Sequence, residues 1–194
     1  MISYFSSYDR LKLIIALTSY LVFNVFNRIT NKFANFLIKR GVKRGDRVAA
    51  VLPNFPETVV AFLASAKIGA IWSSCSADFG PQAVIDRFVQ ISPKVLVISD
   101  CYFYNNKTIN TLSKVKEILK AITSIETIVV IPFNEIKLCQ EPEFRYESWA
   151  SIMNNFDEVT QDEIFEFNIP LYILYSSGTT GPPKCIVHGA GGSL

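Results

Sequence analysis

The stretch from Lys43 to Ser73 decides the fold, and it reads KRGDRVAAVLPNFPETVVAFLASAKIGAIWS. Its apolar, β-branched run Val48 to Leu52 predicts a buried strand, which the following proline ends. A proline also suits the first turn of a helix, so we expect a helix from Pro56 to about Ile68. A second apolar run, Ala70 to Ser73, predicts another strand after the next glycine. The stretch is therefore a strand–helix–strand unit.

The same alternation continues downstream. The patterns predict a helix over 81–91, a strand over 94–99, a helix over about 108–122, a strand over 127–132, a short helix over 149–153, and strands over 171–175 and 185–188. Continuous apolar strands between helices indicate a parallel sheet covered on both faces. We therefore expect an α/β fold, with a mostly parallel sheet flanked by helices and an acidic connector over 134–168.

Upstream of this unit, apolar residues from Tyr20 to Leu37 recur at steps of three and four, which predicts an amphipathic helix. Gly41 is suited to close this helix in the left-handed conformation. Residues 11–26, LKLIIALTSYLVFNVF, hold twelve apolar residues of sixteen, but four polar residues interrupt them. A membrane span needs about twenty mostly apolar residues. A membrane partner is therefore not expected, although an anchor formed by residues 11–26 stays open as an alternative.

Composition narrows the function. The 194 residues include 19 Lys and Arg against 17 Asp and Glu, a net charge of +2 without a basic stripe, which argues against nucleic acid. The four cysteines are widely spaced and His188 is the single histidine, so no zinc ligand set is present. Nothing indicates secretion, and we expect a cytoplasmic protein in a reducing compartment.

The most informative stretch is Tyr175 to Lys184, YSSGTTGPPK. Its glycines allow backbone N–H groups to turn toward an anion, and its hydroxyl side chains add hydrogen-bond donors. Lys184 supplies a positive charge at a reach that two prolines restrict. The spacing differs from a Walker A loop, in which the lysine directly follows the glycine. A Ser/Thr/Gly-rich surface turn is the alternative, but the whole pattern favours a phosphate-binding loop.

This loop resembles the signature loop of the adenylate-forming enzymes, the superfamily of acyl-CoA synthetases, luciferases and peptide-synthetase adenylation domains. The segments GVKRGDRVAAVLPN and IGAIWSSCSADFG upstream, and IVHGAGG downstream, resemble the branch of acid–CoA ligases that activate acetoacetate. The chain departs from many members at Cys185, where they have glycine. The resemblance covers residues 17–194, which we expect to be part of the family's N-terminal AMP-binding domain, whereas residues 1–16 match nothing in the family.

The resemblance implies a reaction and its ligands. The carboxylate of acetoacetate attacks ATP to give an acyl-adenylate and diphosphate, and the thiol of CoA then displaces AMP. The residues that the resemblance places around the ATP phosphates are Ser176, Ser177, Gly178, Thr179, Thr180, Gly181 and Lys184. Thr180 is also implied to lie near Mg²⁺, and Lys107 near the CoA phosphates. Because the family's remaining motifs would follow Leu194, we expect the chain alone to be inactive.

Two further residues are candidates for lining the substrate site. Trp72 follows the start of a strand, and ligands of α/β sheets bind where strands end. His188 lies shortly after the phosphate loop. The alternative interpretations are that Trp72 is an aromatic residue that packs in the core and that His188 is a structural histidine. Asp86 and Arg87 are expected to form a solvated pair on a helix.

Other interpretations of the whole chain stay open at this stage. The acid could be acetate, propionate or a longer acyl chain, because the pocket that selects it lies mostly outside this sequence. The chain could also be a non-enzymatic module that retains nucleotide binding alone. The sequence gives no indication of the oligomeric state.

Overall fold

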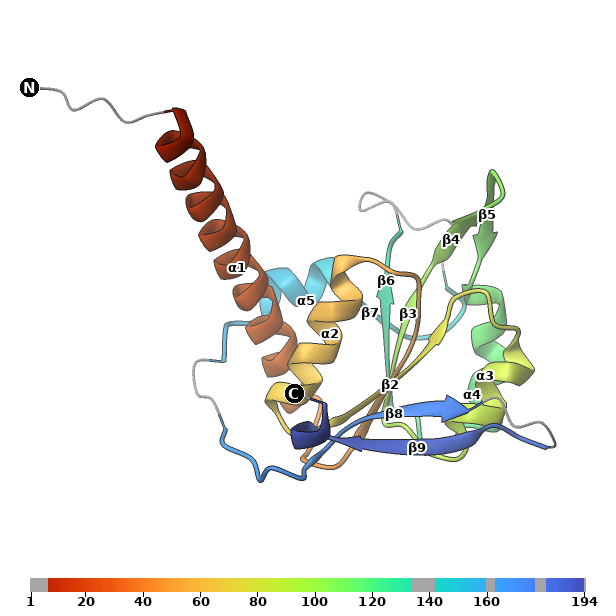
Figure 1. Ribbon diagram of the computed structural model, residues 1–194. Coiled ribbons are helices and arrows are strands. Elements are labelled where there is room, and N and C mark those ends of the chain that lie inside the picture. The colour runs from red at the N-terminus through yellow and green to blue at the C-terminus, as the bar shows by residue number, and fades with distance from the viewer. Residues whose placement is uncertain (1–6, 134–141, 160–162, 177–180, 194) are drawn as a thin grey trace, which may run out of the picture.

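A computed structural model of the chain describes residues 7–133, 142–159, 163–176 and 181–193. Its seven-stranded sheet has the order β7-β6-β3-β1-β2-β8-β9, and all neighbours are parallel except β8 and β9 (Figure 1). The strands are β1 (Arg47–Leu52), β2 (Ile71–Ser76), β3 (Val95–Ser99), β6 (Thr127–Ile131), β7 (Glu147–Ser148), β8 (Pro170–Ser176) and β9 (Lys184–Gly189). The expected mostly parallel α/β sheet is confirmed.

Helices cover both faces of this sheet (Figure 1). They are α1 (Ser7–Lys39), α2 (Pro56–Lys67), α3 (Pro81–Phe88), α4 (Val115–Ala121) and α5 (Trp149–Asn155), with short 3₁₀ turns at Leu112–Lys114 and Ala190–Gly192. Successive side chains of the central strand β1 enter different cores, as the alternation of a strand requires. Val48 and Ala50 pack with α1, α2 and α5, whereas Ala49 and Val51 pack with α3 and α4.

Helix α1 ends as the sequence predicts. Gly41 adopts a φ of +75°, and the Val42 N–H donates to Leu37 O at 3.0 Å, which closes the last turn. Phe33 and Phe36 are fully buried against the sheet. Burying an aromatic side chain of this size stabilises a fold by about 1.5–3 kcal/mol. The helix begins earlier than the expected start at Tyr20 and continues across position 16.

The amino-terminal half of α1 projects away from the sheet (Figure 1). Tyr20, Leu21, Val22, Phe23 and Val25 are all exposed there. Over the described part of the chain, no helix is long and apolar enough to cross a membrane.

The region from Cys101 to Asn110 corrects the prediction of a helix over 108–122. It forms a two-stranded antiparallel hairpin of β4 (Cys101–Tyr104) and β5 (Lys107–Asn110). Asn105 and Asn106 have φ values of +48° and +57°, which is the two-residue turn that matches the twist of paired strands. Helix α4 therefore starts only at Val115.

Smaller differences concern the ends of elements. Strand β2 continues to Ser76, beyond the expected end at Ser73, so Ser74 and Ser76 also lie within the strand. Hydroxyl groups are tolerated inside the sheet because Ser73 Oγ donates to Ile173 O of β8 at 3.0 Å. Helix α3 ends at Phe88 instead of Ile91.

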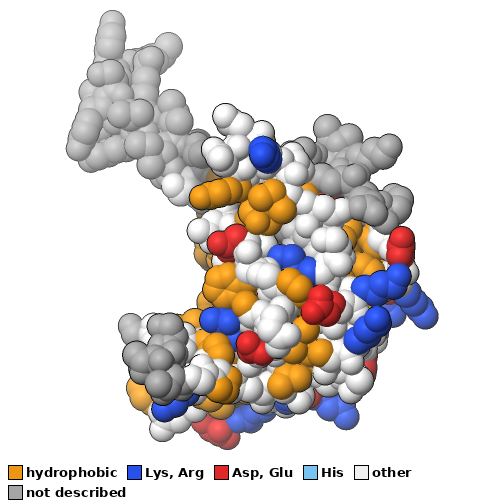
Figure 2. All heavy atoms as spheres, turned by 90° about the vertical axis from the view of Figure 1, so that its right-hand side faces the viewer, with side chains coloured by type: hydrophobic (Ala, Val, Ile, Leu, Met, Phe, Trp, Pro, Cys, Tyr) orange, Lys and Arg blue, Asp and Glu red, His pale blue; other side chains and the backbone are white. Residues whose placement is uncertain are grey.

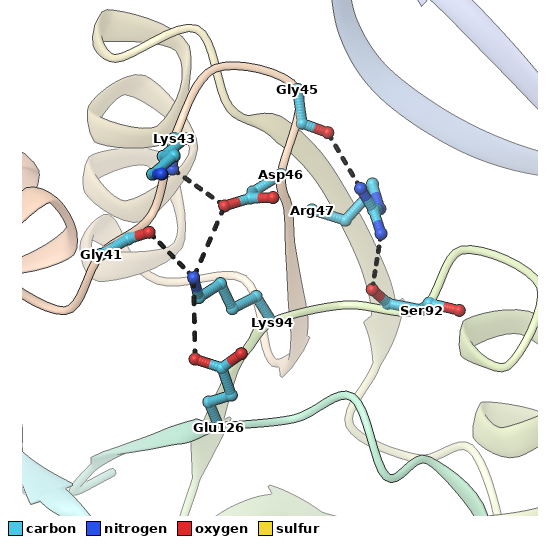
Figure 3. A network of polar contacts seen from close by, with 8 residues as sticks. All are labelled: Gly41, Lys43, Gly45, Asp46, Arg47, Ser92, Lys94 and Glu126. Atoms are coloured by element: carbon cyan, nitrogen blue, oxygen red, sulfur yellow. Dashed lines mark hydrogen bonds and ion pairs between the residues drawn. The ribbon is translucent and has the colours of Figure 1, made fainter.

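A polar network joins the amino ends of β1, β3 and β6 (Figure 3). Lys94 Nζ donates to Gly41 O at 2.9 Å and lies 3.9 Å from Asp46 Oδ2 and 3.6 Å from Glu126 Oε2. Because one ammonium group faces acceptors that precede β1 and β6, it links the turns that lead into neighbouring strands.

Arg47, the first residue of β1, extends this network toward the turn before β3. Its guanidinium donates to three carbonyl oxygens, those of Ile91, Ser92 at 2.9 Å and Gly45 at 3.1 Å. Ser92 has a φ of +46°, and these bonds help to hold that turn. The amino edge is thus built from charged groups whose partners are supplied by the protein.

Candidate functional site

The opposite, carboxyl edge of the sheet carries the predicted phosphate-binding loop. Strands β2 and β8 pair Ser73 with Ile173 and end at Ser76 and Ser176, which keep the same spacing. Parallel strands therefore bring these two ends to one edge. In open α/β sheets, ligands bind in the crevice outside this edge.

The loop itself connects two antiparallel strands. Ser176, the last residue of β8, pairs with Lys184, the first of β9. Directly opposite residues of an antiparallel pair place their side chains on the same face, with Cβ atoms about 5 Å apart. Gly181 adopts a φ of +100°, which a side chain would disfavour. The structure thus brings together Ser176 and Lys184.

The remaining predicted phosphate ligands lie outside the described residues. They are Ser177, Gly178, Thr179 and Thr180, and the last of these is also the predicted magnesium neighbour. Their roles stay predictions.

Lys184 is available for an anion. Its side chain is exposed, and among the described residues it has no ion pair or hydrogen bond. Charge-assisted hydrogen bonds to phosphate are stronger than neutral ones, and a lysine binds phosphate as a point charge. The mouth of the loop therefore offers a hydroxyl group and an exposed cation on one face.

Behind the loop, Tyr175 and Cys185 lie on the other face of the β8–β9 hairpin and are partly buried. The Ser73 hydroxyl is hydrogen-bonded to the Tyr175 hydroxyl at 3.1 Å, and the Arg87 guanidinium lies 5.8 Å from the centre of the Tyr175 ring. Burial raises the pKa of Tyr175 well above its usual range, although Ser73 and Arg87 oppose the rise. Burial also raises the pKa of Cys75 to about 12. Both groups are therefore neutral at physiological pH.

Arg87 differs from its expected role as half of a solvated pair with Asp86. Its guanidinium lies over the Phe79 ring at 4.7 Å and donates to Ala83 O, while Asp86 accepts a hydrogen bond from Gln82. The arginine therefore packs between α3 and the loop after β2. Such cation–π contacts contribute about 0.5–2 kcal/mol.

A cavity of about 380 Å³ lies next to this edge. It is formed where β1 and β2 end, and the β4–β5 hairpin closes one side. Its lining residues are Leu52, Pro53, Asn54, Thr58, Ser74, Cys75, Ser76, Ala77, Asp78, Tyr102 and Tyr104. The polar groups among them suit a ligand with hydrogen-bonding atoms.

Lys114 fixes one wall of this cavity. Its ammonium group donates to Ala77 O at 2.8 Å and to Phe79 O at 2.6 Å. Burial lowers the pKa of Lys114, and the charge of Asp78 partly restores it. The sequence analysis did not identify this lysine, because its contacts cross more than thirty positions.

Lys107, the predicted CoA contact, lies on the hairpin beside the cavity. It is exposed and pairs with Tyr104, whose side chain lines the cavity.

Figure 2 looks onto the side of the molecule that carries α3, α4 and the β4–β5 hairpin, and it shows hydrophobic side chains in separate patches among charged ones. Phe103 and Tyr104 contribute exposed aromatic rings on the hairpin.

Trp72 and His188 lie in a row across three strands. Trp72 of β2 pairs with Tyr172 of β8, which pairs with His188 of β9. The His188 ring stacks on Tyr172 at 4.8 Å, and Trp72 is only 6% exposed beside Phe62. His188 lies four residues beyond Lys184, about 13 Å along the strand. The substrate roles of both residues stay predictions.

A larger cavity, of about 600 Å³, lies at the amino edge between α4, β6 and β7. Among the described residues that line it, none is a predicted ligand-binding residue. The position of the phosphate loop therefore favours the smaller cavity at the carboxyl edge.

The described residues contain no group of three His, Cys, Asp or Glu side chains that could hold a metal ion. Magnesium is commonly bound through one or two protein ligands together with substrate phosphates. The donors at this edge are consistent with a magnesium ion that is held mainly by nucleotide phosphates.

Comparisons of this chain with protein families, with curated proteins and with solved structures agree with one another. The model of the AMP-binding enzyme family matches residues 9–194. Among curated proteins, an acetoacetyl-coenzyme A synthetase of Rhizobium meliloti (strain 1021) is 43% identical over 90% of this chain and 27% of its own length. An acetoacetyl-CoA synthetase of Xenopus tropicalis is 44% identical over 84% of this chain and 25% of its own length.

A solved structure agrees with these relatives. The acetoacetyl-CoA synthetase from Streptomyces lividans superposes with a TM-score of 0.79 and 38% sequence identity, over 86% of this chain and 25% of that one. The chain thus spans about a quarter of the length of the relatives that it matches.

Proposed function

The chain belongs to the AMP-binding enzyme family, and from this premise we propose that it supplies the ATP-phosphate-binding part of an acetoacetate–CoA ligase. The observation that carries the proposal is the pairing of β8 and β9, in which Ser176 and the exposed Lys184 share one face. The names of the relatives support acetoacetate as the acid.

In the proposed reaction, the acetoacetate carboxylate attacks the α-phosphorus of ATP, and diphosphate leaves with the electron pair of the broken P–O bond. The residues of this chain would act on the leaving diphosphate by charge and position rather than by covalent bonding. Lys184 would neutralise negative charge on the β- and γ-phosphates. Ser176 and the loop up to Gly181 would donate hydrogen bonds to the same oxygens.

Magnesium would be held chiefly by the phosphates, and when bound it would neutralise their charge. Thr180 is the proposed protein neighbour of the ion. Lys184 would then confine the phosphates from the opposite strand of the hairpin.

In the second half-reaction, the thiol of CoA attacks the acyl carbonyl and AMP leaves. We assign the CoA phosphates to the vicinity of Lys107, since this exposed lysine stands beside the cavity of about 380 Å³. Trp72 and His188 remain proposed neighbours of the substrate. A cytosolic location is part of the proposal, since the four cysteines are widely spaced in the sequence.

Binding of MgATP to the 194-residue chain tests the proposal. Isothermal titration calorimetry is expected to detect a single site, and Lys184→Met is expected to weaken it at least tenfold. Lys116→Met is the matched control, because Lys116 is exposed on α4 and away from the loop. Equal weakening in both variants, or no MgATP binding by the unmodified chain, would contradict the proposal.

Catalysis is tested separately. Acetoacetate-dependent release of diphosphate is expected to be absent from the chain alone, because it spans a quarter of its relatives. MgATP binding without turnover supports the phosphate-binding role. Release of diphosphate with acetate or propionate, rather than acetoacetate, would instead assign another short-chain acid.

A further inference from the structure

We propose that Gln90 is a positioning residue for the phosphate loop, an inference that rests on the function proposed above. Gln90 follows α3, more than ninety positions before Pro183 in sequence. Its Nε2 donates to Pro183 O at 2.8 Å, and its Oε1 accepts a hydrogen bond from Cys185 Sγ at 3.4 Å. One side-chain amide thus bonds to both sequence neighbours of Lys184.

The orientation of this amide is determined by a third bond. Gln90 Nε2 also donates to Asp86 O, one turn earlier, at 2.7 Å. An amide has two N–H donors, and both are used here. The oxygen must therefore point toward Cys185, so the amide cannot rotate without losing contacts.

Helix α3, which ends two residues before Gln90, is itself held against the β8–β9 hairpin. Arg87, three residues earlier, contacts Phe79 and Tyr175 through its guanidinium. Phe88 is fully buried and lies near Tyr175, with 6.5 Å between ring centres. Gln90 therefore extends from a packed element toward a loop that projects at the edge of the sheet.

The hydrogen bond from Gln90 to Pro183 is important for the loop because of the chemistry of proline. Pro183 has no N–H, so its carbonyl is its only backbone hydrogen-bonding group. The bond from Gln90 satisfies that carbonyl directly before Lys184. Holding the Pro183 carbonyl on one side of Lys184 and the Cys185 side chain on the other restricts where the ammonium group can reach, which lowers the entropy cost of binding a phosphate.

The test uses the 194-residue chain with Gln90→Ala and Gln90→Asn. Gln82→Ala is the matched control, because Gln82 lies on α3, shortly before Gln90, and among the contacts of the described residues its side chain bonds only to Asp86. The first measurement is the rate of Cys185 alkylation by iodoacetamide, followed by mass spectrometry of the Cys185 peptide. The second is the affinity for MgATP by calorimetry.

Gln90→Ala is expected to raise the alkylation rate of Cys185 threefold to tenfold and to weaken MgATP binding by a similar factor, at unchanged melting temperature. Gln90→Asn, whose amide is too short to span both contacts, is expected to behave like Gln90→Ala. Gln82→Ala is expected to change neither quantity. Unchanged alkylation and affinity in the Gln90 variants would overturn the inference, and so would equal effects in the control.

The two measurements also separate this inference from the proposed function. If the unmodified chain binds no MgATP, the proposed function fails and the nucleotide role of Gln90 fails with it. Alkylation of Cys185 needs no nucleotide, so it still decides whether Gln90 holds the loop. If MgATP binds normally but the Gln90 variants bind it equally well, the inference alone fails.

Discussion

The two edges of the parallel sheet use lysine in opposite ways. At the amino edge, Lys94 bonds to a carbonyl oxygen and lies near two carboxylates, all of which belong to the protein (Figure 3). At the carboxyl edge, Lys184 is exposed and has no partner among the described residues. The first lysine joins strands together, and the second is free to bind a ligand.

The difference shows how one fold separates stability from binding. A charge that the protein pairs contributes to folding, and its removal leaves acceptors without a donor. A charge without a partner contributes little to folding and can be used in full by an anion. Substitutions at the amino edge should therefore change stability, whereas those at the loop should change binding.

The largest effect is expected at the amino edge. Arg47→Met leaves three carbonyl oxygens without their charged donor, and we expect the free energy of unfolding to fall by about 2–4 kcal/mol. Urea denaturation followed by circular dichroism measures this loss. A change below about 0.5 kcal/mol would mean that water replaces the arginine there. It would contradict the view that charged groups at the amino edge stabilise the fold.

The next effect is expected at the carboxyl edge. Lys184→Met should leave the free energy of unfolding within about 0.5 kcal/mol of the unmodified chain, since the side chain is exposed. The affinity for MgATP should fall at least tenfold. Denaturation and calorimetry on the same preparation check both parts. A large loss of stability would show that Lys184 has a structural partner.

Alkaline pH provides a third comparison. The pKa of Cys75 is about 12 in the folded protein, against an ordinary value of 9.0, because burial disfavours the thiolate. Between these values the folded state retains a proton that the unfolded chain releases. The contribution of Cys75 to stability is therefore complete below pH 9 and falls as pH rises, by at most about 1.4 kcal/mol per pH unit.

The same measurement in Cys75→Ala isolates this contribution. Lys114 acts in the opposite direction, since burial lowers its pKa and favours the folded state as pH rises toward 10.5. The difference between the two chains removes the effect of Lys114. Urea denaturation at pH 8, 9 and 10 should give a smaller loss of stability in Cys75→Ala. Parallel curves would show that the thiol ionises in the folded protein as it does in water.

The smallest effect is expected at the β4–β5 hairpin, which carries Lys107. Lys107→Ala should weaken binding of CoA twofold to fivefold, as removal of one exposed charge near a phosphate would, about 0.4–1 kcal/mol. Lys116→Ala is its control, because Lys116 is an exposed lysine of α4 that pairs with Glu143. Equal CoA affinity in both variants would remove Lys107 from the proposed site.

Much of the fold is local and could be predicted from the sequence. Apolar runs such as Val48 to Leu52 determine the buried strands, and Gly41 determines where α1 ends. The hairpin of β4 and β5 could not be predicted in this way. Thr108 to Ile122 has a pattern compatible with a helix, and only pairing with Cys101–Tyr104 favours a strand at its start.

The candidate site, like the fold, has parts that the sequence predicts and parts that only the tertiary structure shows. The sequence by itself determined the family and predicted a phosphate loop, because ten consecutive residues, Tyr175 to Lys184, carry their own conformational and chemical preferences. Only the tertiary structure decided that Lys94 is paired whereas Lys184 has no partner within the described part of the chain, and that Gln90 bonds to Pro183 and Cys185. The physical reason is that these partners come from distant parts of the chain, and packing alone brings them together.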